Sequence, residues 1–317
     1  MKLPSSRGNS RIEVLAIRLG RVLESDPDAG YQLAKDIVTR ERAHRAIEPA
    51  LEAIAARPGL DARPCLRDRF ADLTETGMRY DQDCALRIKI VQILRAIGSA
   101  EDVDLAEQGV RLIQLNPPAR VDVAQALRGQ SLLLLAEIAP DRAQYFAVEL
   151  LHDPHESAFS GEPAVTAIQV LAARGSILPI WALARRPGSH ADVLAQAFAS
   201  LRAAPPDLQL DALLGHLADA GARGENGEGV ALVTAEAIVL NRLTGGYSAV
   251  VDLVRDTPNL NLCRYLAITA ARSGDGGLLG LLRGVAASVN DPDKLDILRE
   301  TLDLPRPTAH QPSPRGQ

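Results

Sequence analysis

Aromatic residues are scarce in this sequence. Trp, Tyr and Phe together make up 3% of its 317 residues. Proteins that bind single-stranded nucleic acids stack the bases on aromatic side chains, so this scarcity disfavours that function. Excess positive charge is also missing, because 35 lysines and arginines stand against 40 aspartates and glutamates. A protein that binds a nucleic-acid duplex needs a basic surface, and we therefore expect no nucleic-acid partner.

Cysteines are few and hydrophobic runs are short. Cys65, Cys84 and Cys263 lie far apart and form no CxxC motif, which disfavours a disulfide framework and a zinc site. We expect these thiols to be buried in a reducing compartment. No run of about 18 apolar residues is present, and residues 1–10 lack the apolar core of a signal peptide. The sequence thus predicts a cytoplasmic protein with no membrane partner.

Strand patterns are missing as well. No run of β-branched residues alternates with polar ones, whereas Ala and Leu, both strong helix formers, are abundant. Apolar side chains recur every three or four positions in residues 10–25, which is typical of an amphipathic helix. Ser10 is its expected N-cap, with Glu13 as the capping-box partner. Further helices are expected over these ranges: 30–42, 43–59 and 62–77.

From residue 82 onward one pattern recurs. A helix ends at a small residue, a short turn and a second helix follow, and a polar loop leads to the next copy. The turns are expected at Gly98, Ala139, Gly175, Ala204, Gly245 and Gly274. Their spacing suits repeats of two helices. Each helix pair has more apolar surface than it can bury alone, so we expect neighbouring pairs to stack on one another.

Two of these copies carry a family resemblance. The segments ILRAIGSAEDVDLAEQGV and VLAARGSILPIWALA resemble HEAT repeats, including the variety known from phycobilisome lyases. The resemblance covers residues 82–290. It implies an all-α fold, a right-handed α-α superhelix of antiparallel helix pairs, in which the second helices line a concave face. It also implies protein binding as the common function.

The expected domain organisation follows from these patterns. Residues 1–9 are predicted to be disordered, 10–80 to form N-terminal helical cap hairpins and 81–303 to form the HEAT-like repeats. The tail at 304–317 is rich in proline and polar residues, which predicts disorder. Residues 221–230 hold four glycines and are expected to form a mobile loop.

Candidate binding residues lie on the expected second helices. Trp, Tyr and Arg dominate the energetics of protein interfaces, and charged neighbours add specificity. The candidates are Tyr145, Glu149, Trp181, Arg185, Tyr247, Asp252 and Arg255. Packing in the core is the competing interpretation for the three aromatic residues, above all for Trp181 in the apolar segment ILPIWALA.

Two other clusters have a possible chemistry. His152, Asp153 and His155 are residue types that bind divalent metals, although they fall where a solvated loop is expected and Asp153 suits a cap. The segments around 40–45 and 63–69 hold six arginines that could contact phosphates. Acidic residues interleave with them, and Glu41 precedes Arg45 by the four positions that favour an ion pair on a helix.

The sequence contains no HExxH, GxSxG or P-loop motif. We therefore expect a non-enzymatic scaffold or adaptor that binds a protein partner on its concave face and needs no cofactor. The alternative is a HEAT-like enzyme or enzyme accessory factor, similar to a bilin lyase or a DNA glycosylase.

Overall fold

The computed structural model describes residues 6–118, 120–157, 159–223 and 227–302, and this part of the chain is helical almost throughout. The all-α prediction is confirmed. Contacts divide the chain into two compact units, which we call unit 1 (residues 1–174) and unit 2 (residues 175–317). The domain boundary expected at residue 80 falls inside unit 1. Within the described residues, no helix has the length and apolar character needed to cross a membrane.

The described residues of unit 1 form nine α-helices, two short 3-10 helices and a small hairpin. The α-helices are α1 (Ser6–Ser25), α2 (Pro27–Arg40), α3 (His44–Ala56), α4 (Arg63–Tyr80), α5 (Ala85–Ile97), α6 (Val103–Arg111), α7 (Gln125–Ile138), α8 (Pro140–Leu150) and α9 (Ala164–Ala173). Short 3-10 helices are η1 (Leu60–Ala62) and η2 (Ala100–Asp102). The antiparallel strands β1 (Leu115–Asn116) and β2 (Val121–Asp122) form the hairpin, which the sequence did not predict because two residues are too few to show alternation.

The first helix begins earlier than expected. Ser10 lies inside α1, which starts at Ser6, so the predicted N-cap was wrong and residues 6–9 are helical rather than disordered. The rest of the segment predicted to be disordered, residues 1–5, lies outside the described residues. The next helix has a clear start, because Asp26 accepts a hydrogen bond from the backbone N–H of Ala29 (3.0 Å) and Pro27 occupies the first turn.

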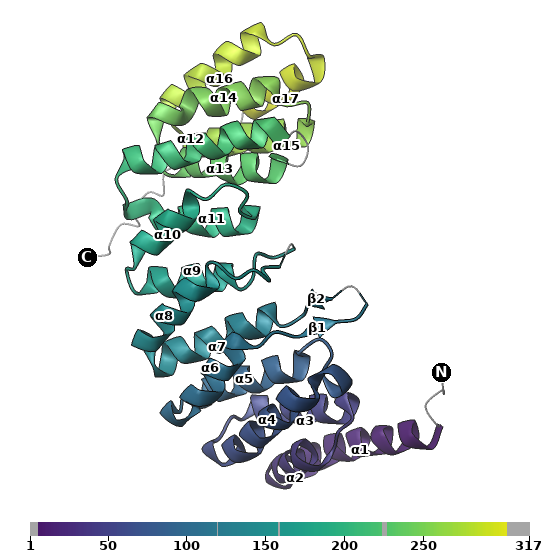
Figure 1. The fold of residues 1–317 in the computed structure, drawn as a ribbon. Coiled ribbons are helices and arrows are strands. Elements are labelled where there is room, and N and C mark those ends of the chain that lie inside the picture. The colour runs from purple at the N-terminus through teal and green to yellow at the C-terminus, as the bar shows by residue number, and fades with distance from the viewer. Residues whose placement is uncertain (1–5, 119, 158, 224–226, 303–317) are drawn as a thin grey trace, which may run out of the picture. The chain divides into compact units, whose positions relative to one another are not determined.

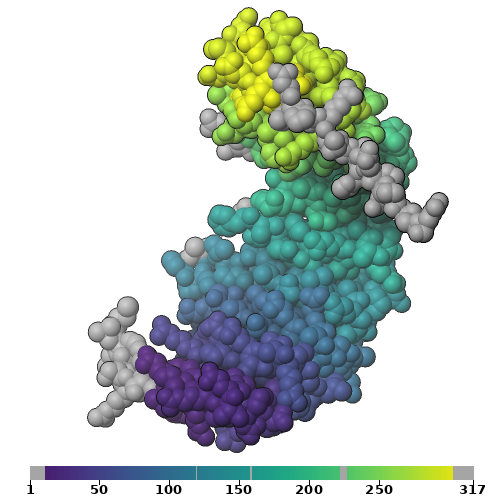
Figure 2. Space-filling view, turned by 180° about the vertical axis from the view of Figure 1, so that it is seen from behind, coloured from purple at the N-terminus to yellow at the C-terminus, as the bar shows by residue number. Residues whose placement is uncertain are grey.

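Helices in unit 1 pack on their near neighbours in the sequence. α5 packs on α7 and α7 packs on α9, while α6 and α8 both pack against α7 (Figure 1). The colour in Figure 2 accordingly changes steadily through the helices of this unit. Ile90 of α5, Leu132 of α7 and Ile168 of α9 are fully buried along this series. The helices of this series therefore bury apolar side chains against helices that are near them in the sequence.

Unit 2 continues the same alternation of helices and turns. Its helices are α10 (Ile177–Ala184), α11 (Ala191–Ser200), η3 (Leu201–Ala203), α12 (Pro206–Arg223), α13 (Glu228–Leu240), η5 (Thr244–Gly246), α14 (Tyr247–Asp256), α15 (Leu260–Ser273), α16 (Gly276–Ser288) and α17 (Pro292–Leu302). α11, α13, α15 and α17 pack on one another in that order, and α14 packs on α16.

All six turn residues expected from the sequence lie between two consecutive α-helices, Gly245 within η5. Gly98, Gly175 and Gly274 have φ angles of 69°, 70° and 66°, the left-handed conformation in which a glycine ends a helix without strain. The glycine-rich loop expected at 221–230 is shorter, because α12 runs to Arg223 and α13 starts at Glu228. Residues 224–226 and the predicted tail at 304–317 lie outside the described residues.

Candidate protein-binding surfaces

In unit 1, α8 presents an aromatic side chain to solvent. Pro140 starts this helix, and one of its faces is buried through Ala143, Ala147 and other small or apolar residues. The opposite face carries Tyr145, Val148 and Glu149, all exposed, with Tyr145 at 77% of its full exposure. A tyrosine so exposed offers a large, rigid contact area that a partner could bury.

Contacts with α6 hold α8 in this orientation. Arg142 of α8 forms an ion pair with Glu107 of α6, and the guanidinium of Arg111 lies 4.6 Å from the ring centroid of Phe146. Phe146 itself is 6% exposed and packs into the core. The helix is therefore fixed on one side, and the exposed face of Tyr145 is a preformed surface.

In unit 2, α10 carries a similar surface. Leu178 is 80% exposed, whereas Trp181 is half-buried and its indole Nε1 has no hydrogen-bond partner among the described residues. The guanidinium of Arg185 lies 5.2 Å from the Trp181 ring centroid and pairs with Asp211 of α12. His216 of α12 also binds this helix, with its Nε2 2.5 Å from the carbonyl oxygen at the end of α10.

The remaining candidates lie on or near α14 and differ in accessibility. Tyr247 is 4% exposed and donates a hydrogen bond to Asp275 Oδ2 (3.0 Å), and burial raises the pKa of its hydroxyl. It is a core residue, as the competing interpretation held. Asp252 and Arg255 are exposed and form an ion pair of 2.9 Å. Hydrogen bonds from Arg255 also lower the pKa of Asp256. The charges of Asp252, Arg255 and Asp256 are therefore paired mainly with one another.

The three candidate metal ligands at 152–155 do not form a site. Asp153 is engaged through both oxygens: Oδ1 accepts the backbone N–H of His155 (2.7 Å), and Oδ2 forms an ion pair with Arg128 Nε (2.7 Å). Among the described residues, the one set of three histidine and carboxylate donors that lie mutually within 4.8 Å is a different one, at the start of α3 and in the loop that precedes α5. Asp153 thus stabilises its own loop, while His152 is exposed.

Sequence reasoning missed the buried ion pair to which Asp153 belongs. Arg128 of α7 is 1% exposed, and its Nη1 binds Asp122 Oδ2 (2.5 Å) and the carbonyl oxygen of Leu112 (2.9 Å). Its Nη2 reaches the carbonyl oxygen of His155 (3.3 Å). One side chain therefore ties α7 to the loop before it and to the loop after α8.

The preceding helix pair repeats this arrangement. Arg87 of α5 is fully buried, and its Nε donates to Asp81 Oδ2 (2.9 Å) while its Nη2 donates to Gln114 Oε1 (2.5 Å). The backbone N–H of Gln114 in turn donates to Asp122 Oδ1 (2.9 Å), which links the two ion pairs. The equal spacing of Asp81 to Arg87 and Asp122 to Arg128 was a signal in the sequence that could have revealed them.

Most arginines of the two basic segments are occupied within the fold. Arg67 forms ion pairs with Asp102 and Asp104, both at 2.8 Å. The hydrogen bonds from Arg67 to Asp104 lower the pKa of Asp104. Arg69 donates to the carbonyl oxygens at the end of α2. The expected pairing of Glu41 with Arg45 was wrong: α2 ends before Glu41, which pairs with Arg11 of α1 at 2.8 Å instead.

Comparisons of the chain with protein-family models, with curated proteins and with solved structures found no match.

Proposed function

We propose that this protein is a cytoplasmic, non-enzymatic scaffold that binds a partner protein through the second helices of stacked, HEAT-like helix pairs. Two features support the stacking. Within each unit the helices pack on their near neighbours in the sequence, and every expected turn residue lies between two consecutive α-helices. Free cysteines at 65, 84 and 263 are compatible with a reducing compartment.

The observation that carries the binding proposal is the exposed face of α8. Tyr145 points into solvent from a helix whose other side is firmly packed, and Val148 and Glu149 lie beside it. A tyrosine on a rigid helix loses little conformational freedom when a partner covers it, which is why tyrosine is enriched in binding hot spots. α10 offers a second surface of this kind, with Leu178 exposed beside Trp181 and Arg185.

Affinity capture from extracts of the protein's native cells, followed by mass spectrometry, tests the proposal. We expect the wild-type chain to recover a reproducible partner and Tyr145→Ala to lose it, because removing a hot-spot side chain weakens binding by about 2 kcal/mol or more, roughly thirtyfold.

Tyr265→Ala is the matched control. Tyr265 is also exposed, at 42%, but it lies on α15, the first helix of its pair, where its hydroxyl donates to Glu236. We expect this variant to retain the partner. Recovery of no reproducible partner, or equal loss in both variants, would contradict the proposal.

A further inference from the structure

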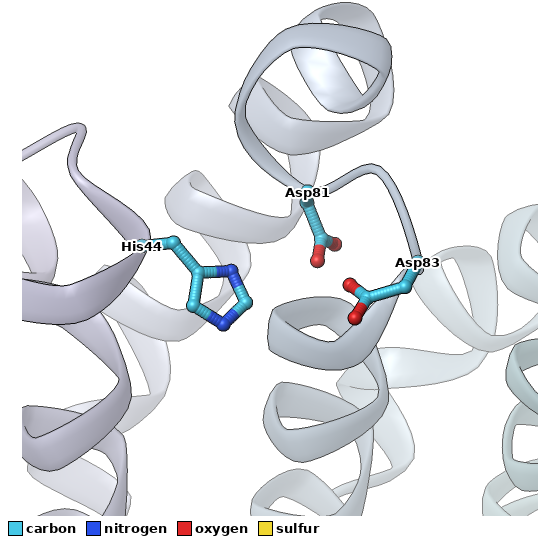
Figure 3. Close-up of side chains that lie close together, drawn as sticks. All are labelled: His44, Asp81 and Asp83. Carbon is cyan, nitrogen blue, oxygen red and sulfur yellow. The ribbon is translucent and has the colours of Figure 1, made fainter. Parts of the chain in front are cut away.

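The start of one helix and a loop of unit 1 bring a histidine and two aspartates together. His44 is the first residue of α3, and Asp81 and Asp83 lie between α4 and α5. One donor atom from each lies within 4.8 Å of the other two. Figure 3 shows the imidazole and both carboxylates directed toward the same space. We propose that these three side chains bind one divalent cation of the zinc type.

The backbone directly after the two aspartates is held in an unusual conformation. Cys84 has a φ of 61°, in the left-handed region that residues other than glycine seldom adopt. This conformation costs of the order of 1 kcal/mol or more, and such strain persists where the surroundings impose it and is concentrated at functional sites. Here it lies at the residue that follows Asp83 and precedes α5.

Asp81 is positioned before any ion arrives. Its side chain is fully buried, its Oδ2 accepts hydrogen bonds from the N–H and the Nε of Arg87, and its Oδ1 accepts one from the N–H of Leu86 (3.0 Å). Oδ1 therefore keeps a lone pair that could ligate a cation. A ligand carboxylate that is oriented by hydrogen bonds from outside the site is the usual arrangement in metalloproteins.

The charges around the site favour a cation. The two carboxylates face each other, while Arg87 is the positive group bound to one of them. Asp83 is exposed and accepts the backbone N–H of Ala85 (3.2 Å). A bound cation would offset the remaining repulsion between the carboxylates.

The geometry needs only a small closure. Ligands held at about 2.1 Å from a tetrahedral zinc ion lie roughly 3.4 Å apart. The two outer side chains can move inward, because Asp83 is exposed and His44 is one-third exposed. Nε2 of His44 is 3.8 Å from Glu48, a residue placed to orient the imidazole. One nitrogen and two oxygen ligands favour Zn²⁺ over Mg²⁺ and Ca²⁺, which prefer oxygen alone.

Isothermal titration calorimetry of the full-length, chelator-treated chain with Zn²⁺ tests this site. We expect one Zn²⁺ per chain and no comparable binding of Mg²⁺. His44→Ala and Asp83→Asn should each weaken binding by more than about tenfold, since changes merely behind a ligand already cause such losses. Both variants leave the buried pair of Asp81 and Arg87 intact, and far-UV circular dichroism should show their helix content unchanged.

His190→Ala is the matched control, since His190 is also half-buried and its Nδ1 lies 3.7 Å from the carboxylate of Asp192. This variant should leave the affinity for Zn²⁺ unchanged. Substitution with Co²⁺ gives a second readout, because visible d–d bands that disappear in His44→Ala identify the imidazole as a ligand. Absence of saturable Zn²⁺ binding, or binding that either His44→Ala or Asp83→Asn leaves intact, would overturn the three-ligand site.

Discussion

Replacing Arg128 should lower the denaturant concentration at which unit 1 unfolds much more than replacing an exposed arginine does. Arg128→Met keeps most of the side-chain volume but leaves Asp122 and Asp153 buried without their counter-charge. Breaking a buried ion pair by removing one partner costs about 3 to 5 kcal/mol, because the remaining charge stays desolvated. With a denaturant slope of about 2 kcal/mol per molar urea, the midpoint should fall by roughly 2 M.

Urea titration followed by circular dichroism at the helix band measures this change. Arg174→Met is the matched control, because its ion pair with Asp141 is exposed and worth at most about 1 kcal/mol. Adding Asp122→Asn and Asp153→Asn to Arg128→Met should recover part of the lost stability by removing the unpaired charges. Equal midpoints for Arg128→Met and Arg174→Met, or no recovery in the triple variant, would refute the reasoning.

Three further outcomes are expected. Gly77→Ala should destabilise the protein by about 1 to 3 kcal/mol, since the new Cβ would lie 2.5 Å from Arg87 Nη2. Gly215→Ala should stabilise it by about 0.5 to 1 kcal/mol, because Gly215 lies within a helix and the new Cβ would meet open space. Thermal unfolding measures both changes and distinguishes their signs. Glu162→Gln should stabilise the protein at pH 7. Burial raises the pKa of Glu162 above its ordinary 4.5, so the wild-type protein loses stability as the pH rises from 4.5 through the raised pKa. The stability gained by Glu162→Gln should therefore vanish in melts recorded below pH 4. Burial raises the pKa of the Cys84 thiol to about 12, so a thiol reagent at pH 8 should label it only after unfolding; rapid labelling of the native chain would contradict its burial.

The helix pairs were predictable because their signals are local. Glycine at Gly98 and Gly274 ends a helix through its own conformational freedom, and Pro140 starts one without a neighbour's help. The exact ends of the helices were not predictable. α1 begins at Ser6, before the expected cap at Ser10, since no residue in this short stretch forbids a helix. The short β1–β2 hairpin was not predicted, because strands of two residues are too short to show an alternating pattern.

The candidate surface was predictable only in part. Tyr145 and Tyr247 are both tyrosines on the second helix of a pair, yet one is exposed and the other buried, because the face that each presents depends on how its helix packs. The group of His44, Asp81 and Asp83 was not predicted at all. The histidine belongs to α3 and the two aspartates to the loop between α4 and α5, and only the packed fold brings these segments together.

Photo-cross-linking in native cells tests the central claim most directly. Benzoylphenylalanine placed at position 145 on α8 would sample the partner-binding face, and the same group at position 265 on α15 would sample an exposed position on a first helix. We predict a discrete cross-linked protein adduct from position 145 and none from position 265. No adduct at position 145, or an equal adduct at both positions, would contradict binding through the second helices.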